Sequence, residues 1–111
     1  MTEGEYPTRR QYPRHKVTAF IDYAGNGEFA HRVENISLGG VCIHTAVLEE
    51  VGTTVDIVIK FPSLDAKFTT EGEVAWVNAD ELGDMGIRFI GLDAAARQQL
   101  QQLIDETREE D

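Results

Sequence analysis

The sequence predicts an all-β domain with a single helix at its C-terminal end. About six short apolar segments, separated by turn-forming residues every 8 to 12 residues or so, are typical of a small antiparallel barrel or sandwich. Only the last segment has a helical repeat, in which Leu100, Leu103 and Ile104 follow an i, i+3, i+4 pattern. The 111 residues suffice for one domain that buries roughly two-thirds of its surface.

The expected strands are segments rich in β-branched and aromatic residues. They span residues 17–23, 29–36, 41–46, 55–61, 68–76 and 87–90. The turn Gly25-Asn26-Gly27 predicts a hairpin between the first two, and Gly83 and Gly86 are expected to bracket the turn before the last.

The second strand contains a break in its alternation. Val33 is apolar in one phase and Ile36 in the opposite phase. A β-bulge near Glu34-Asn35 would let Val33 and Ile36 both face the core. Asn35 and Ser37 would then point together out of the domain, just before Gly39-Gly40.

The fifth strand alternates regularly, so Phe68, Val74 and Trp76 are expected on one face. We therefore predict that Trp76 packs in the core rather than stacking on a ligand. Gly72 is the expected site of a bulge or bend in this strand.

The helix is expected to begin after Asp93, a plausible N-cap before Ala94-Ala95-Ala96. Acidic residues at 106 and 109–111 place negative charge at the helix C-terminus, where the helix dipole disfavours it. We expect this end to fray.

Composition excludes several kinds of partner. The net charge of −10 disfavours nucleic acid polymers and membrane surfaces, because phosphates would be repelled. No apolar run approaches the ~20 residues that a membrane helix needs, and the N-terminus lacks the apolar stretch of a signal peptide. Cys42 is the sole cysteine, which fits a reducing compartment. We expect a cytoplasmic protein without membrane insertion.

A basic cluster at residues 9–16 opposes this acidity. It contains Arg9, Arg10, Arg14 and Lys16 and no acid, although the chain has 20 Asp and Glu against 10 Lys and Arg. In an extended segment Arg10, Tyr12 and Arg14 would project to the same side. Such a local cluster suits a compact ligand with one or two phosphates, because screening isolates it from distant charges.

Two motifs carry a family resemblance. Arg10 and Arg14 form an Arg-x-x-x-Arg motif, and Asn35, Ser37 and Gly40 form an Asn-x-Ser-x-x-Gly motif after 20 intervening residues. The pair resembles the two signatures of the PilZ domain family, and residues 86–89 resemble the end of the family's barrel. The likeness covers roughly residues 9–104.

The resemblance implies a six-stranded antiparallel β-barrel with a C-terminal α-helix and a flexible N-terminal arm. The expected organisation is a disordered tail at 1–8 and one PilZ-like domain at 9–111. Within that domain, residues 9–16 form the arginine arm, 17–92 the barrel and 93–107 the helix.

The resemblance also implies a ligand, cyclic di-GMP, taken up singly or as an intercalated pair. Arg10 and Arg14 would engage guanine and phosphate, while Asn35 and Ser37 would contact the other guanine and its neighbouring phosphate. A guanidinium suits both partners, since its planar fork matches guanine O6 and N7 or two phosphate oxygens. The expected ligand-binding residues are Arg9, Arg10, Arg14, Asn35, Ser37, Gly39 and Gly40; Arg9 either contacts the ligand or is only solvated.

The resulting hypothesis is a stand-alone cyclic di-GMP receptor whose arm becomes ordered on ligand binding and which relays the signal to an unidentified effector protein. No enzymatic activity, cofactor or metal is expected, because the carboxylates are scattered and His15, His31 and His44 lack metal-ligand spacing. Two alternatives remain: a ligand-independent adaptor that acts through protein contacts, and a single-stranded nucleic-acid-binding barrel.

Overall fold

The computed structural model describes residues 12–23, 31–45, 48–78 and 83–109. Several expectations therefore lie outside the described residues: the tail at 1–8, Arg9, Arg10 and the turn at 25–27.

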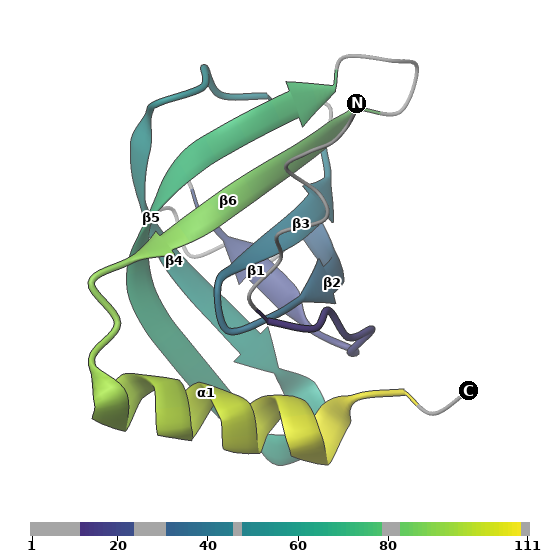
Figure 1. The fold of residues 1–111 in the computed structure, drawn as a ribbon. Coiled ribbons are helices and arrows are strands. Elements are labelled where there is room, and N and C mark those ends of the chain that lie inside the picture. The colour runs from purple at the N-terminus through teal and green to yellow at the C-terminus, as the bar shows by residue number, and fades with distance from the viewer. Residues whose placement is uncertain (1–11, 24–30, 46–47, 79–82, 110–111) are drawn as a thin grey trace.

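Six strands form one closed antiparallel barrel in the order β1-β2-β3-β6-β5-β4 (Figure 1). Their bounds are β1 Phe20–Asp22, β2 His31–Ile36, β3 Gly40–His44, β4 Thr54–Phe61, β5 Ala66–Asn78 and β6 Asp84–Ile90. The short β1 closes the barrel by pairing with both β2 and β4. The predicted six-stranded barrel is confirmed.

Alternate side chains of the strands point inward and fill the barrel interior. In β4, Ile57, Ile59 and Phe61 are fully buried between more exposed residues, as the sequence predicts. Met85 and Ile87 of β6 meet them from the other side of the core. The outward residues of the same strands are left to form the surface on which a site can be built.

The predicted bulge in β2 is present. The pairing of β2 with β3 shifts register between Val33 and Asn35, so that Val33 faces Ile43 and Asn35 faces Cys42. Val33 is 1% and Ile36 0% exposed. The extra residue keeps both apolar side chains inside and turns Asn35 outward.

A second bulge, in β5, overturns two predictions. The register of β5 against β6 shifts between Val74 and Trp76, which sends Trp76 to the outer face, where it is 39% exposed. The expected core packing of Trp76 is therefore wrong. Gly72 is not the bulge; it pairs regularly with Val55 and Phe89, and a Cβ there would lie 2.5 Å from Ile57 Cδ1.

The end of the β5–β6 connection also differs from the prediction. β6 already begins at Asp84, and Gly86 is an interior strand residue paired with Cys42 and Trp76. Gly83, with a φ of 69°, does fit a turn.

Helix α1, Ala94–Thr107, lies across one end of the barrel (Figure 1). Asp93 is its N-cap, as predicted, since its side chain accepts a hydrogen bond from Ala96 N at 2.8 Å. Leu100 and Ile104 are the buried residues of its inner face. No helix in the described part of the chain is long and apolar enough to cross a bilayer.

The predicted fraying of the helix end stays a prediction, and residues 110–111 lie outside the described residues. After α1, Glu109 N donates to Lys16 O at 2.8 Å, and Arg108 forms an isolated antiparallel β-bridge with Val17. Arg32 adds an ion pair with Glu109 at 3.9 Å. These contacts join the segment after the helix to the segment that precedes β1.

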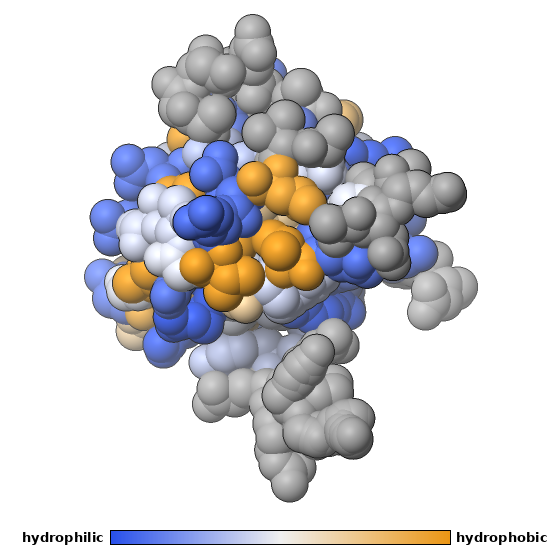
Figure 2. All heavy atoms as spheres, turned by 90° about the horizontal axis from the view of Figure 1, so that it is seen from above, coloured by the Kyte–Doolittle hydropathy of each residue, from blue (hydrophilic) through white to orange (hydrophobic). Residues whose placement is uncertain are grey.

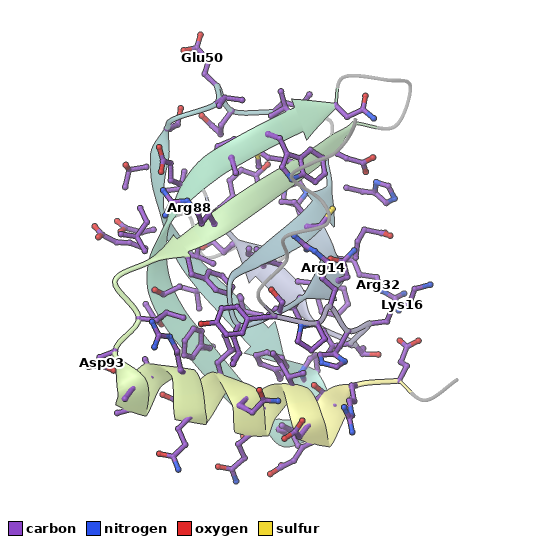
Figure 3. All side chains as sticks on the ribbon, viewed as in Figure 1. Arg14, Lys16, Arg32, Glu50, Arg88 and Asp93 are labelled. Atoms are coloured by element: carbon purple, nitrogen blue, oxygen red, sulfur yellow. The ribbon has the colours of Figure 1, made fainter. Side chains whose placement is uncertain are left out.

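The barrel end away from α1 has a different surface. Figure 2 looks onto it from above and shows apolar side chains gathered between hydrophilic ones. Val51, beside Glu50 at this end (Figure 3), is 60% exposed. The two barrel ends are therefore unequal, one covered by α1 and the other displaying apolar groups.

Gly40 allows β3 and β6 to approach each other, because a Cβ on Gly40 would lie 2.4 Å from Ile87 O. We expect Gly40→Ala to lower the free energy of unfolding by about 2 kcal/mol, since backbone atoms must move to relieve the overlap. Urea denaturation followed by circular dichroism measures this. Gly39→Ala is the matched control, because the nearest atom to its Cβ would be Tyr12 Cδ2, in a side chain, at 3.3 Å. Equal stability of the two variants would contradict the prediction.

Candidate functional site

The described part of the arginine arm runs along β2. His15 N donates to Ile36 O at 2.8 Å, and Ile36 N donates to His15 O at 2.9 Å. This isolated antiparallel bridge fixes the backbone next to Arg14 at the point where β2 ends. The arm is thereby aligned with the strand that carries the second motif.

Arg14 and Asn35 are in direct contact. Arg14 Nη1 donates a hydrogen bond to Asn35 Oδ1 at 2.6 Å. The outward position of Asn35 follows from the bulge in β2, so the contact depends on that extra residue. A donor that carries charge makes this hydrogen bond stronger than one between neutral groups. The two motifs, far apart in the sequence, thus meet at one place.

Ser37, Gly39 and Gly40 shape the turn between β2 and β3. Ser37 N donates to Gly40 O at 2.9 Å, and Ser37 Oγ accepts from Gly39 N at 3.0 Å. Ser37 is only 5% exposed, so it points outward less than the sequence predicted. Its hydroxyl stabilises the turn and also lines a cavity.

A cavity of about 530 Å³ lies beside this turn and the arm. Four of the predicted site residues line it: Arg14, Ser37, Gly39 and Gly40. Asn35 is not one of the lining residues, but it contacts the lining residue Arg14. The volume is within the range of roughly 300–1,000 Å³ that small-molecule sites have.

Sequence reasoning missed the contribution of β5 and β6. Trp76 and Gly86 line the cavity, and a Cβ on Gly86 would lie 2.2 Å from Trp76 Nε1. The indole therefore lies directly over Gly86, which only glycine permits. Alternation assigned Trp76 to the core, and nothing in the sequence marks the bulge that turns it outward.

Arg88 is a further cavity residue that was not predicted. It lies between Gly40 of β3 and Glu73 of β5 in the strand register, and it forms an ion pair with Glu73. Figure 3 shows Arg14 and Arg88 on the same side of the barrel. Arg14, Arg88 and the Trp76 indole thus line one cavity together with Gly40, Gly86 and Arg97.

A charge cluster lies on the same outer surface, one row of residues away. His44 Nε2 contacts Glu34 Oε2 at 3.1 Å, while His44 Nδ1 contacts Asp84 and lies 3.3 Å from Gly83 O. Desolvation lowers the pKa of His44, but the Gly83 carbonyl and the carboxylates of Glu34 and Asp84 outweigh it and raise this pKa above its ordinary value of 6.5. The cluster links β2, β3 and β6 beside the site.

The described residues contain no group of histidines, cysteines and carboxylates arranged to hold a metal ion. The cavity instead offers guanidinium groups, a hydroxyl, backbone at glycines and an aromatic face. These groups suit a planar, anionic organic ligand: guanidiniums bind phosphate, and an indole can stack on a base.

Comparison with known proteins identifies the family. The family model for the PilZ domain matches residues 8–106. The chain therefore belongs to the PilZ domain family. No curated protein matches the sequence.

Solved structures show the same fold. The inhibitor of motility MotI/DgrA of Bacillus subtilis is similar with a TM-score of 0.72 and 24% identity, over 88% of this chain and 51% of that chain. The PilZ domain of Escherichia coli YcgR with c-di-GMP has a TM-score of 0.72 and 18% identity, over 88% and 90%. The K. pneumonia MrkH–c-di-GMP complex has a TM-score of 0.69 and 16% identity, over 88% and 51%. This chain thus spans about half of the MotI/DgrA and MrkH chains.

The cluster around His44 predicts a pH dependence of stability. Because the pKa of His44 is raised on folding, its stabilising effect is fully present below the unfolded pKa of about 6.5 and is lost as pH rises through the folded pKa. We expect the free energy of unfolding to fall over this interval, and His44→Gln to reduce the fall. Urea denaturation between about pH 5.5 and pH 8.5 measures it. An identical pH profile in the variant would contradict this role.

Proposed function

We propose that this PilZ domain is a cytoplasmic cyclic di-GMP receptor rather than an enzyme. The observation that carries the proposal is the hydrogen bond from Arg14 to Asn35, because it unites both motifs at the edge of one cavity. YcgR and MrkH, which share the fold, have structures with c-di-GMP. The proposed ligand contacts are Arg9, Arg10, Arg14, Asn35, Ser37, Gly39 and Gly40.

The chemistry of each group fits a cyclic dinucleotide. Arg14 donates to Asn35 through Nη1, and the planar fork of a guanidinium matches a phosphate or guanine O6 and N7. Asn35 Oδ1 has a second lone pair that can accept from guanine N1–H. Trp76 offers an aromatic face at the same cavity, on which a purine can stack.

The route of the signal to an effector protein is proposed to begin at the arm. Lys16 lies two residues after Arg14, and Glu109 lies just beyond α1. The backbone O of Lys16 accepts a hydrogen bond from the backbone N of Glu109. Ligand binding that orders the arm would therefore also act on the segment that follows the helix. An ordered arm presents a changed surface to a partner, in the manner of other order–disorder switches.

Arginine substitutions test the proposal. We expect Arg10→Ala and Arg14→Ala each to raise the Kd for cyclic di-GMP by about 100-fold or more, since each removes charge-assisted hydrogen bonds. Isothermal titration calorimetry measures the Kd and the stoichiometry together. Arg32→Ala is the matched control, because Arg32 is an exposed arginine paired with Glu109.

Circular dichroism checks that the variants fold. Unchanged affinity in both arm variants would rule out the assigned site. Absence of cyclic di-GMP binding by the native protein, with a protein partner still recovered by pull-down, would favour the ligand-independent adaptor.

Trp76 supplies an intrinsic probe, because it is the only tryptophan in the chain and lines the cavity. We expect cyclic di-GMP to change its fluorescence with the same Kd that calorimetry gives. Gly86→Ala should weaken binding several-fold, since the new Cβ would displace the indole. Gly52→Ala serves as the control for a general loss of stability, because Gly52 has a φ of 95° and does not line the cavity. If saturating cyclic di-GMP left the Trp76 fluorescence unchanged, base stacking at Trp76 would be excluded.

A further inference from the structure

The cavity has an unusual charge composition for this chain. Three arginines from three separate segments line it: Arg14 of the arm, Arg88 of β6 and Arg97 of α1. None of its described lining residues is acidic, although acids outnumber Lys and Arg by 20 to 10 in the sequence. An acid-free lining with three guanidiniums indicates a ligand with more than one centre of negative charge.

The three arginines differ in what already neutralises them. Arg88 forms an ion pair with Glu73, directly opposite it in the strand register. Arg14 also has a partner, since it donates a hydrogen bond to Asn35 Oδ1. Arg97 has no carboxylate within salt-bridge distance among the residues that the structure describes, so its charge is available to an anion from outside.

The β6–α1 connection brings Arg97 to the cavity. Gly91 has a φ of 73°, a left-handed conformation that glycine adopts without strain, and it lets the chain turn sharply after β6. Asp93 then caps the helix, and Arg97 N donates to Asp93 O in the first helical hydrogen bond. Gly91, Leu92 and Arg97 consequently form the helix side of the cavity. In Figure 3, Asp93 marks this beginning of α1.

We propose that Arg97 binds a phosphate of the cyclic dinucleotide, so that α1 contacts the ligand together with the arm and the barrel. The inference rests on the proposed function and deepens it. A cyclic dinucleotide carries two phosphodiester groups, and the contacts proposed so far come only from the arm and from the β2–β3 region. Arg97 supplies a guanidinium from a second, rigid element.

This assignment gives α1 a role in recognition. About one and two turns of α1 beyond Arg97, the helix is anchored in the core through Leu100 and Ile104. A phosphate held by Arg97 is therefore held by an element that does not need to be ordered on binding.

The test uses the full chain and cyclic di-GMP. We expect Arg97→Gln to raise the Kd about tenfold at low salt, the effect of one charge-assisted contact near the surface. Arg97→Lys, which keeps the charge, should lose less. Arg32→Gln makes the same change of net charge outside the cavity and should leave the Kd within about twofold of the native value. The difference between Arg97→Gln and the native protein should shrink at high salt, because exposed charges are screened.

The outcomes separate this inference from the proposed function. If the native protein binds and Arg14→Ala does not, but Arg97→Gln behaves like Arg32→Gln, the role of Arg97 is overturned and the receptor function stands. If the native protein does not bind cyclic di-GMP, both fall. A larger loss in Arg97→Gln than in Arg32→Gln, with both variants folded by circular dichroism, supports the phosphate contact.

Discussion

The extra residue in β2 determines where the rest of the site lies. Val33 and Ile36 must both be buried, but they lie three positions apart, so a regular strand would expose one of the two. The bulge resolves this conflict and turns Asn35 outward as a consequence. Arg14 can then donate to Asn35, and the arm is aligned against β2 by the bridge between His15 and Ile36. The packing of the core therefore also fixes the position of the motif residue Asn35.

The same device appears once more, on the far side of the cavity. A register shift after Val74 moves Trp76 from the interior to the outer surface, where its indole covers Gly86. Each bulge thus turns one side chain, Asn35 or Trp76, toward the outer surface, while the apolar residues around it stay buried. Bulges locally change the direction of side chains, and here the two act on strands that flank β3 and β6.

Electrostatics distinguishes the cavity from the remaining surface. The chain has a net charge of −10, yet the cavity is bordered by guanidiniums and by no described acid. Arg88 at the cavity is paired with Glu73, and elsewhere on the barrel Arg32 is paired with Glu109 and His44 with Glu34 and Asp84. Acidity outside the cavity repels polyanions, and the local excess of positive charge inside it still attracts a small anion, because screening limits each field to its neighbourhood.

The sequence by itself determined the barrel, the capped helix and the bulge in β2, because these follow from local alternation, turn chemistry and an N-cap residue. For Asp93, Val33 and Ile36, the residues next to them in the sequence are enough to predict the N-cap and the bulge. Trp76, Gly86, Arg88 and Arg97 could not be assigned this way. Their positions depend on which strands pair, on a register shift with no local signal, and on how α1 returns to the barrel. Only the tertiary structure brings the arm, β2, β6 and α1 around one cavity, since residues so far apart in sequence meet only when the barrel closes.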